Sequence, residues 1–319
     1  MRDASAGAPG GNAAAPAPRI TILLCTRNGA AHLEEQLRSY LAQDCPAWDL
    51  WVSDDGSTDG SRAILQAFRD AHGGGRRIRL LDGPGQGGTA NFLSLLTRPD
   101  LPPGPVALSD QDDLWLPHKL SRALRALAGA PGMTLYGAQS LHADRDLRII
   151  GRSRPPRRPP SFGNALVQNI VSGHSAVLSP GALDLVRRAG SQPGLPYHDW
   201  WLYQLVSGAG GQVLIDAEPV LRYRQHEGNV MGAHRGAAAS LARIGALFGR
   251  GYGGWLAANR AALWRVRDLL LPEHRDLLAR ISAAPPGPAR AMAMMRQGVR
   301  RQGGAATAAL WLAAGLGRI

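Results

Sequence analysis

The segment Ser109–Trp115, SDQDDLW, carries three carboxylates within four positions, directly after the apolar run Val106–Leu108. Carboxylates gathered at the end of a buried strand repel one another and lose hydration, so this arrangement is costly unless a cation or a set of hydrogen-bond donors neutralises it. Oxygen-rich sites that leave room for phosphate oxygens and water suit Mg²⁺ or Mn²⁺. The segment therefore predicts a divalent-cation site.

Short apolar runs alternate with segments of helical periodicity before this cluster. Strands are expected at Ile20–Cys25, Trp48–Val52, Arg77–Leu81 and Val106–Leu108, and helices near Leu33–Leu41, Arg62–Ala71 and Thr89–Leu96. This alternation predicts an α/β fold with a mostly parallel sheet, in which ligands bind beyond the carboxyl ends of the strands. Asp54 and Asp55 follow the second strand and Asp110 follows the fourth, so we expect the acidic groups at one edge of the sheet.

Two local motifs allow other interpretations. The stretch VSDDGSTDGS, Val52–Ser61, is compatible with a turn followed by a helix N-cap. A calcium loop beginning at Asp55 is excluded, because Gln66 stands at the twelfth position, where a bidentate glutamate is needed.

The loop Gly83–Gly88 fits the dinucleotide-binding pattern G-x-G-x-x-G and has an acid, Asp110, further along the chain. Against that interpretation, the loop follows the third strand where the fingerprint normally follows the first, and Pro84 lies inside the turn. It also leaves the acidic cluster unexplained. A protein that binds NAD or a nucleotide sugar without transferring anything remains the alternative to an enzyme.

Composition indicates a globular protein and limits its partners. Of 319 residues, 45% are hydrophobic and 19% are charged, which is enough apolar content for a sizeable core. The two cysteines, Cys25 and Cys45, have no metal-type spacing, and we expect a cytoplasmic protein. Residues 1–231 hold 23 basic and 21 acidic side chains, whereas 232–319 hold 13 and 3. The near-neutral first part argues against nucleic-acid binding.

The chain divides into three parts by composition. Residues 1–18 are rich in alanine, glycine and proline and are expected to be disordered; 19–231 form the α/β domain; 232–319 form a basic helical extension. In the extension an apolar stripe is expected from Trp255, Leu256, Leu263, Val266 and Leu270, beside several arginines. The extension is compatible with a helical bundle packed on the first domain, or with a surface that binds anionic lipid on the inner face of the cell membrane. The apolar segment Thr307–Leu316 is too short to span a bilayer.

Five ordered motifs carry a family resemblance: ITILLCTRNGAAHLEEQLRSYLAQ, WDLWVSDDGSTDGS, VALSDQDDLWLPHKL, YHDWWL and RYRQHEGN. Over residues 19–231 the chain resembles inverting glycosyltransferases of family 2 with a GT-A fold, in their bacterial rhamnosyltransferase-like branch. The resemblance implies a metal-dependent hexosyltransferase that moves a sugar from a nucleotide-diphosphate donor, with dTDP-rhamnose favoured. It further implies a glycan or lipid-linked acceptor in bacterial surface polysaccharide or cell-wall synthesis.

The resemblance also assigns roles to the donor side of the site. It implies that Asp112 binds the metal, that His226 reaches the metal or the diphosphate, and that Asp113 supports the site or caps the following helix. Asn91 is expected either to contact the nucleotide or to cap its helix, and Arg224 to contact phosphate. The remaining residues expected to contact the nucleotide sugar are Thr26, Arg27, Asn28, Asp54, Asp55 and Asp110.

On the acceptor side, the family pattern in PYHDWWL makes Asp199 the expected general base, which takes the proton of the attacking hydroxyl. His198 stands where many relatives have glutamate. Trp200 and Trp201 are expected either to form a stacking platform for a sugar or to pack in the core at a helix start. The segment Ser172–Ser175 resembles the acceptor-side loop of the family.

Overall fold

A computed structural model describes residues 19–130, 132–225, 245 and 249–319. The predicted first half of the sheet is confirmed, with ends that differ by one or two residues. Its strands are β1 (Ile20–Thr26), β2 (Trp48–Asp54), β3 (Ile78–Asp82) and β4 (Val106–Ser109), and its helices are α1 (Ala30–Leu41), α2 (Ser61–His72) and α3 (Gly88–Leu96). The segment 1–18, the boundary near residue 231 and the helix expected over 236–248 lie outside the described residues, except for residue 245.

These four strands are parallel and lie in the order β3-β2-β1-β4. Their register brings Thr26 beside Asp54, and Asp54 beside Asp82, while Leu24 pairs with Ser109. The chain crosses from one side of β1 to the other between β3 and β4, so the carboxyl ends of β1 and β4 form the switch point where such sheets bind ligands. The SDQDD segment begins there.

The second half of the sheet is antiparallel in part, which the sequence pattern did not predict. The further strands are β5 (Leu114–Trp115), β6 (Thr134–Ala143), β7 (Ile149–Arg152), β8 (Val177–Leu178) and β9 (Gln212–Arg224). The short strand β8 lies antiparallel between β4 and β6, β9 runs parallel to β6, and β5 pairs antiparallel with the end of β9. The pairing of β5 with β9 holds the chain directly after SDQDD against the sheet.

Two hydrophobic cores cover the two faces of the sheet. One contains α1 and the helix α4 (Lys119–Ala128), with Tyr40, Trp48 and Trp115 buried. The other contains α3, α6 (Pro180–Ala189) and α7 (His198–Gly208). Nine of the eleven residues of α7 are buried, so this helix runs through the core and only its N-terminus is available to a site.

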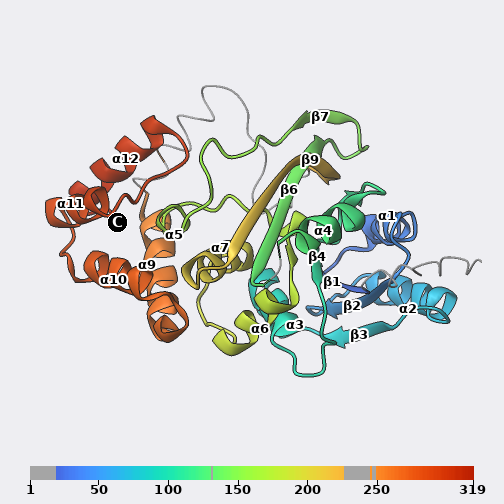
Figure 1. The fold of residues 1–319 in the computed structure, drawn as a ribbon. Coiled ribbons are helices and arrows are strands. Elements are labelled where there is room, and N and C mark those ends of the chain that lie inside the picture. Colours follow the sequence, from blue (N-terminus) through green and yellow to red (C-terminus); the bar gives the residue numbers. More distant parts are fainter. Residues whose placement is uncertain (1–18, 131, 226–244, 246–248) are drawn as a thin grey trace, which may run out of the picture.

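The C-terminal helices gather at one end of the molecule, beyond α7 and the short helix α5 (Phe162–Ala165) and away from α1 and α2 (Figure 1). They are α9 (Arg250–Arg265), α10 (Pro272–Ala283), α11 (Pro288–Arg296) and α12 (Gly304–Gly315). Leu256, Leu263 and Leu310 are buried in the same core as Trp200 and Phe162. The Tyr252 hydroxyl and the Arg301 guanidinium both donate to the Val167 carbonyl. The described helices therefore pack on the α/β part as a bundle.

One part of the predicted stripe on α9 is wrong. Leu256, Leu263 and Leu270 are buried, but the Trp255 side chain is 36% exposed and touches only the edge of Tyr197 among the rings. Among the described residues no helix is both long and apolar enough to cross a bilayer.

Candidate active site

The chain after β1 and the chain after β2 hold each other in place through side-chain caps. Asn28 adopts a positive φ of 51°, and its backbone N–H donates to the Ser57 hydroxyl while its side-chain oxygen accepts from the Thr58 N–H. Asp59 accepts from the first N–H of α1, at Ala30, and from the Ser61 N–H at the start of α2. The interpretation of VSDDGSTDGS as a turn before a helix is therefore correct, but the N-cap of α2 is Gly60, which has no side-chain cap.

Gln111, in the middle of SDQDD, joins the ends of β1 and β4. Its side-chain oxygen accepts from the Thr26 hydroxyl at 2.6 Å and from the Arg27 N–H at 2.8 Å, and its amide nitrogen donates to the Arg27 carbonyl. A Cβ on Gly29 would lie 2.4 Å from the same oxygen, so a larger residue there would displace the Gln111 side chain. The sequence analysis assigned no role to Gln111. Thr26 and Arg27 stand at the switch point, and their contact with a nucleotide remains a prediction.

Asp54 and Asp55 are both buried and engaged by donors from the protein. Asp54 accepts from the Ser57 hydroxyl and N–H and from Arg62, which also donates to Asp82. Asp55 accepts hydrogen bonds from the glycine loop after β3. Each of the two carboxylates therefore has donors from the protein itself and holds the surrounding loops in place. Contact of either carboxylate with base or ribose remains a prediction.

The glycine loop Gly83–Gly88 closes on Asp55. One Asp55 oxygen accepts from the Gly85 N–H and the other from the Gly87 N–H, both at 2.7 Å, and both glycines have positive φ. The loop therefore uses its N–H groups on a carboxylate of its own chain, and it follows β3 at the edge of the parallel strands. These features argue against the dinucleotide interpretation.

Asn91 lies inside α3, so it does not cap that helix. Its side-chain oxygen accepts from the Ser53 hydroxyl and its amide donates to the Ser53 carbonyl at 3.0 Å, with 1% of the residue exposed. The structure thus uses Asn91 to tie α3 to the end of β2. The predicted nucleotide contact has no support from this geometry, because the side chain faces Ser53.

The acidic cluster after β4 divides into a half-buried and a fully buried part. Asp110 and Asp112 are half-buried, whereas Asp113 is 0% exposed and neither of its oxygens has a hydrogen-bond partner among the described residues. Burial, together with the charges of Asp112 and Asp199, raises the pKa of Asp110 to about 7. Asp113 does not cap α4, whose N-cap is His118. The cluster therefore carries strong mutual repulsion, as the sequence predicted.

A buried lysine and a buried histidine lie behind the cluster. The Lys119 ammonium is fully buried, donates to the His174 carbonyl and lies 3.5 Å from the centre of the Trp115 ring. Burial lowers the pKa of Lys119, while Asp113 and Asp110 favour its charged form. Burial, with the nearby Lys119 charge, lowers the pKa of His174 to about 3, so the imidazole is neutral. Lys119 thus lies where its charged form would offset the carboxylates, a position not foreseen from the sequence.

These residues fit a divalent cation. Asp110, Asp113 and His174 each offer a ligand atom, and the three atoms lie within 4.8 Å of one another. Nε2 of His174 has no hydrogen-bond partner in the described part of the chain. Two carboxylates and a neutral imidazole form a donor set that suits a divalent first-row metal. Of the three, only Asp110 is not fully buried, so a diphosphate would approach from its side.

Asp199 stands at the N-terminus of α7 and faces this cluster. Its charge is one of the causes that raise the pKa of Asp110. One Asp199 oxygen accepts from the Gly173 N–H at 3.0 Å, and the other accepts from the Trp200 N–H at 2.7 Å. The predicted acceptor-side loop, Ser172–Ser175, is therefore fastened to the expected base.

His198 packs between that loop and α3. Its ring stacks on Phe92, with centroids 4.1 Å apart, and a Cβ on Gly173 would lie 2.6 Å from its Nε2. Burial lowers the pKa of His198, which leaves the imidazole neutral near pH 7. The histidine therefore acts as a packing group under the loop.

Comparison with known proteins places this arrangement in a family. A family model described as glycosyl transferase family 2 matches residues 21–180, half of the chain, including β1, β2 and the SDQDD segment. The chain belongs to glycosyl transferase family 2. The predicted family is thereby confirmed, and the protein is a glycosyltransferase.

Several relatives resemble this glycosyltransferase. The dTDP-rhamnosyl transferase RfbG of Shigella flexneri is 25% identical over 245 residues, which are 72% of this chain and 80% of the relative. The putative teichuronic acid biosynthesis glycosyltransferase TuaG of Bacillus subtilis is 30% identical over 107 residues, 34% of this chain and 41% of the relative.

Two solved structures show the same fold as this glycosyltransferase. S. aureus TarS 1-349 in complex with UDP-GlcNAc superposes with a TM-score of 0.55 at 15% identity, over 88% of this chain and 93% of that one. Mannosyltransferase PcManGT from Pyrobaculum calidifontis, in complex with GDP-Man and Mn²⁺, superposes with a TM-score of 0.53 at 18% identity, over 94% and 86%. The predicted GT-A fold with C-terminal helices is confirmed.

The glycosyltransferase does not present Trp200 or Trp201 to an acceptor. Trp200 is 4% exposed, with its indole N–H donated to the Ala165 carbonyl, and Trp201 is 0% exposed. Because neither ring offers a face to solvent, the sugar-stacking interpretation is wrong and the core-packing interpretation is correct.

Arg224 is likewise not free to bind phosphate. It is 3% exposed and its guanidinium donates to the carbonyls of Asp112 and Arg145 and to the Glu35 carboxylate. These contacts clamp the chain at Asp112 from the end of β9, so Arg224 positions the acidic segment. His226, predicted to reach the metal or the diphosphate, lies outside the described residues.

Proposed function

We propose that this glycosyltransferase transfers rhamnose from dTDP-rhamnose, with inversion at the anomeric carbon, to a hydroxyl of a glycan or lipid-linked acceptor. We further propose that the product enters a bacterial surface polysaccharide or the cell wall. The similarity to RfbG extends over 72% of the chain and supports the donor. The shorter similarity to TuaG, named for teichuronic acid biosynthesis, supports the pathway class.

One observation carries the proposal: the half-buried carboxylates Asp110 and Asp112 lie at the end of β4, and Asp199 at the start of α7 is close enough to Asp110 for its charge to raise the pKa of that carboxyl. The first two lie at the switch point, where a nucleotide diphosphate binds in sheets of this kind. Asp199 comes from a separate element that also holds the acceptor-side loop. Donor and acceptor functions thus meet at one place.

In the proposed reaction the acceptor oxygen bonds to the anomeric carbon, and the bond from that carbon to the donor phosphate breaks. Asp199 takes the proton of the attacking hydroxyl, and the nucleoside diphosphate leaves with the bonding electron pair. The two N–H donors from Gly173 and Trp200 fix the orientation of the Asp199 carboxylate.

Asp110, Asp113 and His174, whose ligand atoms lie within 4.8 Å of one another, would hold a divalent cation. Asp112, which the resemblance assigns to the metal, is not one of these three, and its contact with the cation stays a prediction. When bound, Mg²⁺ or Mn²⁺ supplies Lewis-acid stabilisation of the negative charge on the leaving diphosphate. Gln111 keeps the chain before Asp112 fixed to β1, and Arg224 fixes the carbonyl of Asp112. Both residues act by positioning.

We also propose that the protein works in the cytoplasm, docked on the inner face of the cell membrane through its last two helices. Four exposed large apolar side chains lie on α11, α12 and the residue after α12: Met292, Met295, Leu312 and Leu316. Arginines 296, 300 and 318 near them are exposed. Apolar side chains flanked by arginines are the composition of surfaces that bind anionic lipid.

A thermal-shift screen of nucleotide sugars with Mn²⁺ tests the donor, because a ligand that binds only the native state raises the melting temperature. We expect dTDP-rhamnose to give a larger shift than UDP-glucose or UDP-GlcNAc. A larger shift from a UDP-sugar would remove rhamnose from the proposal. Release of free sugar from a radiolabelled donor would separate an enzyme from a binding protein.

A further inference from the structure

An open groove of about 540 Å³ lies between the α/β part and the C-terminal helices. Three segments that are distant in sequence form it: the chain after β7 at 154–157, the chain after α5 at 168–170, and the start of α12 at 301–306. The α/β part and the C-terminal helices both contribute, so the groove exists only when the bundle is packed on the domain.

The groove is lined by cationic and neutral polar side chains. Arg154, Arg157 and Arg301 line it, with three side-chain amides, and none of its described lining residues is acidic. The Arg154 and Arg157 side chains are exposed and make no hydrogen bond or ion pair within the described part of the chain. Guanidinium groups gathered without carboxylates favour an anionic ligand, and phosphate matches their paired donors best.

The floor of the groove is fixed by hydrogen bonds. Gln302 ties the segments together: its N–H donates to Gln168, its side-chain oxygen accepts from the Arg158 N–H, and its amide donates to Asn164. Arg301 donates to the Val167 carbonyl and the Tyr252 hydroxyl, while its buried Nε has no partner among the described residues. Such a site is organised before ligand binds, which reduces the entropy lost on binding.

Helix α12 adds to the attraction for an anion. Gly304, Ala305 and Ala306, at its first turn, line the groove, and no described side chain caps this helix end. The N–H groups of a first turn have no partner within the helix, and the helix dipole is positive there.

The groove adjoins the expected base. Gly173, whose N–H donates to Asp199, follows Ile170 in the groove wall by three positions. Three residues of chain span at most about 11 Å. The end of the groove at Ile170 is therefore no further from Gly173 than the length of about one or two sugar units.

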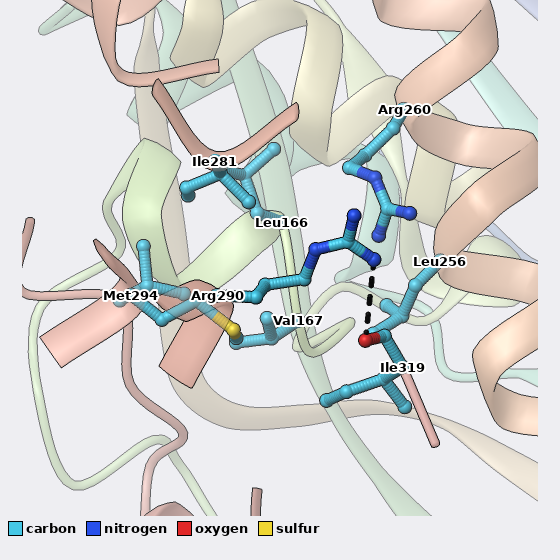
Figure 2. Close-up of a pocket in the computed structure, with 9 residues that line it drawn as sticks. Leu166, Val167, Leu256, Arg260, Ile281, Arg290, Met294 and Ile319 are labelled. Carbon is cyan, nitrogen blue, oxygen red and sulfur yellow. Dashed lines mark hydrogen bonds between the residues drawn. The ribbon is translucent and has the colours of Figure 1, made fainter. Parts of the chain in front are cut away.

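A second cavity among the C-terminal helices does not compete with this groove. Arg260 and Arg290 point into it, and Arg290 donates to the Ile319 carbonyl (Figure 2). Its volume is about 20 Å³, which is room for about one water molecule.

We propose that the groove binds a phosphate or diphosphate group carried by the acceptor substrate and so places the acceptor hydroxyl at Asp199. The proposal rests on the proposed function, since it identifies the chemical class of the acceptor. An acceptor without phosphate would leave the three arginines of the groove without an anionic partner.

The test uses the double variant Arg154→Ala/Arg157→Ala, with Arg125→Ala/Arg280→Ala as control. All four arginines are exposed, and both variants lose two positive charges. Calorimetric titration with inorganic pyrophosphate in EDTA measures binding of pyrophosphate to the groove alone. EDTA removes divalent cations, so the carboxylate cluster cannot hold a diphosphate. We expect wild type and control to bind equally, and the groove variant to bind about tenfold more weakly or worse.

Two further measurements distinguish an acceptor phosphate from a lipid headgroup, and the groove proposal from the proposed donor. Binding of dTDP-rhamnose with Mn²⁺ should be equal in all three proteins. If none of them binds it, the proposed donor is wrong, and the pyrophosphate titration still tests the groove. Sedimentation with phosphatidylglycerol vesicles should also be equal. Equal pyrophosphate affinity in the groove variant and wild type would overturn the proposal. A groove variant that loses only vesicle binding would overturn it in favour of a lipid headgroup site.

Discussion

The backbone N–H of Gly173 donates a hydrogen bond to Oδ2 of Asp199 across 3.0 Å. The two residues come from different elements, the loop before β8 and the first turn of α7, which meet beside the acidic cluster. A Cβ on Gly173 would collide with His198, so the close approach of loop and helix requires glycine there. The contact fixes the carboxylate that the account makes the general base.

Asp199→Asn should bind donor as wild type does and transfer it slowly. The amide keeps the shape of the side chain but cannot take a proton, and a general base typically contributes about 10²- to 10⁴-fold to the rate. Transfer or donor hydrolysis at saturating donor is the measurement. A rate within a few-fold of wild type would mean that another residue is the base.

Gly83→Ala should destabilise the protein by about 1–3 kcal/mol. The added Cβ would lie 2.8 Å from both Asn91 Oδ1 and Asp55 Oδ1, which hold the glycine loop and α3. Gly74→Ala is the control, because its Cβ meets nothing within 4 Å. Urea unfolding of both variants gives the comparison, and equal midpoints would show that the loop is not held as described.

His198→Gln should reduce the sensitivity of the fold to acid. Burial lowers the folded-state pKa of His198 below 6.5, so the native state takes up its proton less readily than the unfolded chain. Its contribution to stability is therefore present above pH 6.5 and is lost as the pH falls towards the folded-state pKa. The fall in melting temperature between about pH 8 and pH 5 should be smaller in the variant. An equal fall would contradict the assignment.

Leu312→Ser/Leu316→Ser should weaken sedimentation with anionic vesicles about tenfold or more, because both side chains would enter the lipid interface. They are 57% and 62% exposed, so the fold should be unaffected. Ile149→Ser/Ile150→Ser, in β7 away from α12 (Figure 1), removes equally exposed apolar groups and should have no effect. Equal losses in the two variants would exclude docking through α12.

The parallel half of the sheet could be predicted because each strand is a short, mostly apolar run followed by polar loop residues, with Asp49 in β2 and Arg79 in β3 as interruptions. The rest depends on distant pairing. Strand β9 pairs with β6, which lies about 80 residues earlier in the chain. Register shifts near Pro219 interrupt the alternation of apolar and polar residues by which a strand is recognised. Helix α7 is buried on nearly all sides, so its two tryptophans could not be distinguished from a ligand platform by sequence alone.

A site residue was predictable where its motif directly follows a recognisable strand, as at Asp110 and Asp112. It was not predictable where the partner comes from a remote segment. Arg224 had the sequence appearance of a phosphate ligand, but Glu35 and the Asp112 carbonyl take up its donors. The sequence assigned no role to Lys119, and only the packing of α4 against the His174 loop shows it as a buried lysine behind the carboxylates.

The most direct test of the account is calorimetric titration of dTDP-rhamnose with Mn²⁺ into wild type and Asp112→Asn, with Asp184→Asn, an exposed site on α6, as control. Asp112 is half-buried at the open side of the cluster, so its replacement should leave the melting temperature unchanged. We expect Mn²⁺-dependent donor binding in wild type and in the control, and its loss in Asp112→Asn. Equal affinity in all three proteins would contradict the claim that the carboxylates after β4 hold the cation and the donor diphosphate.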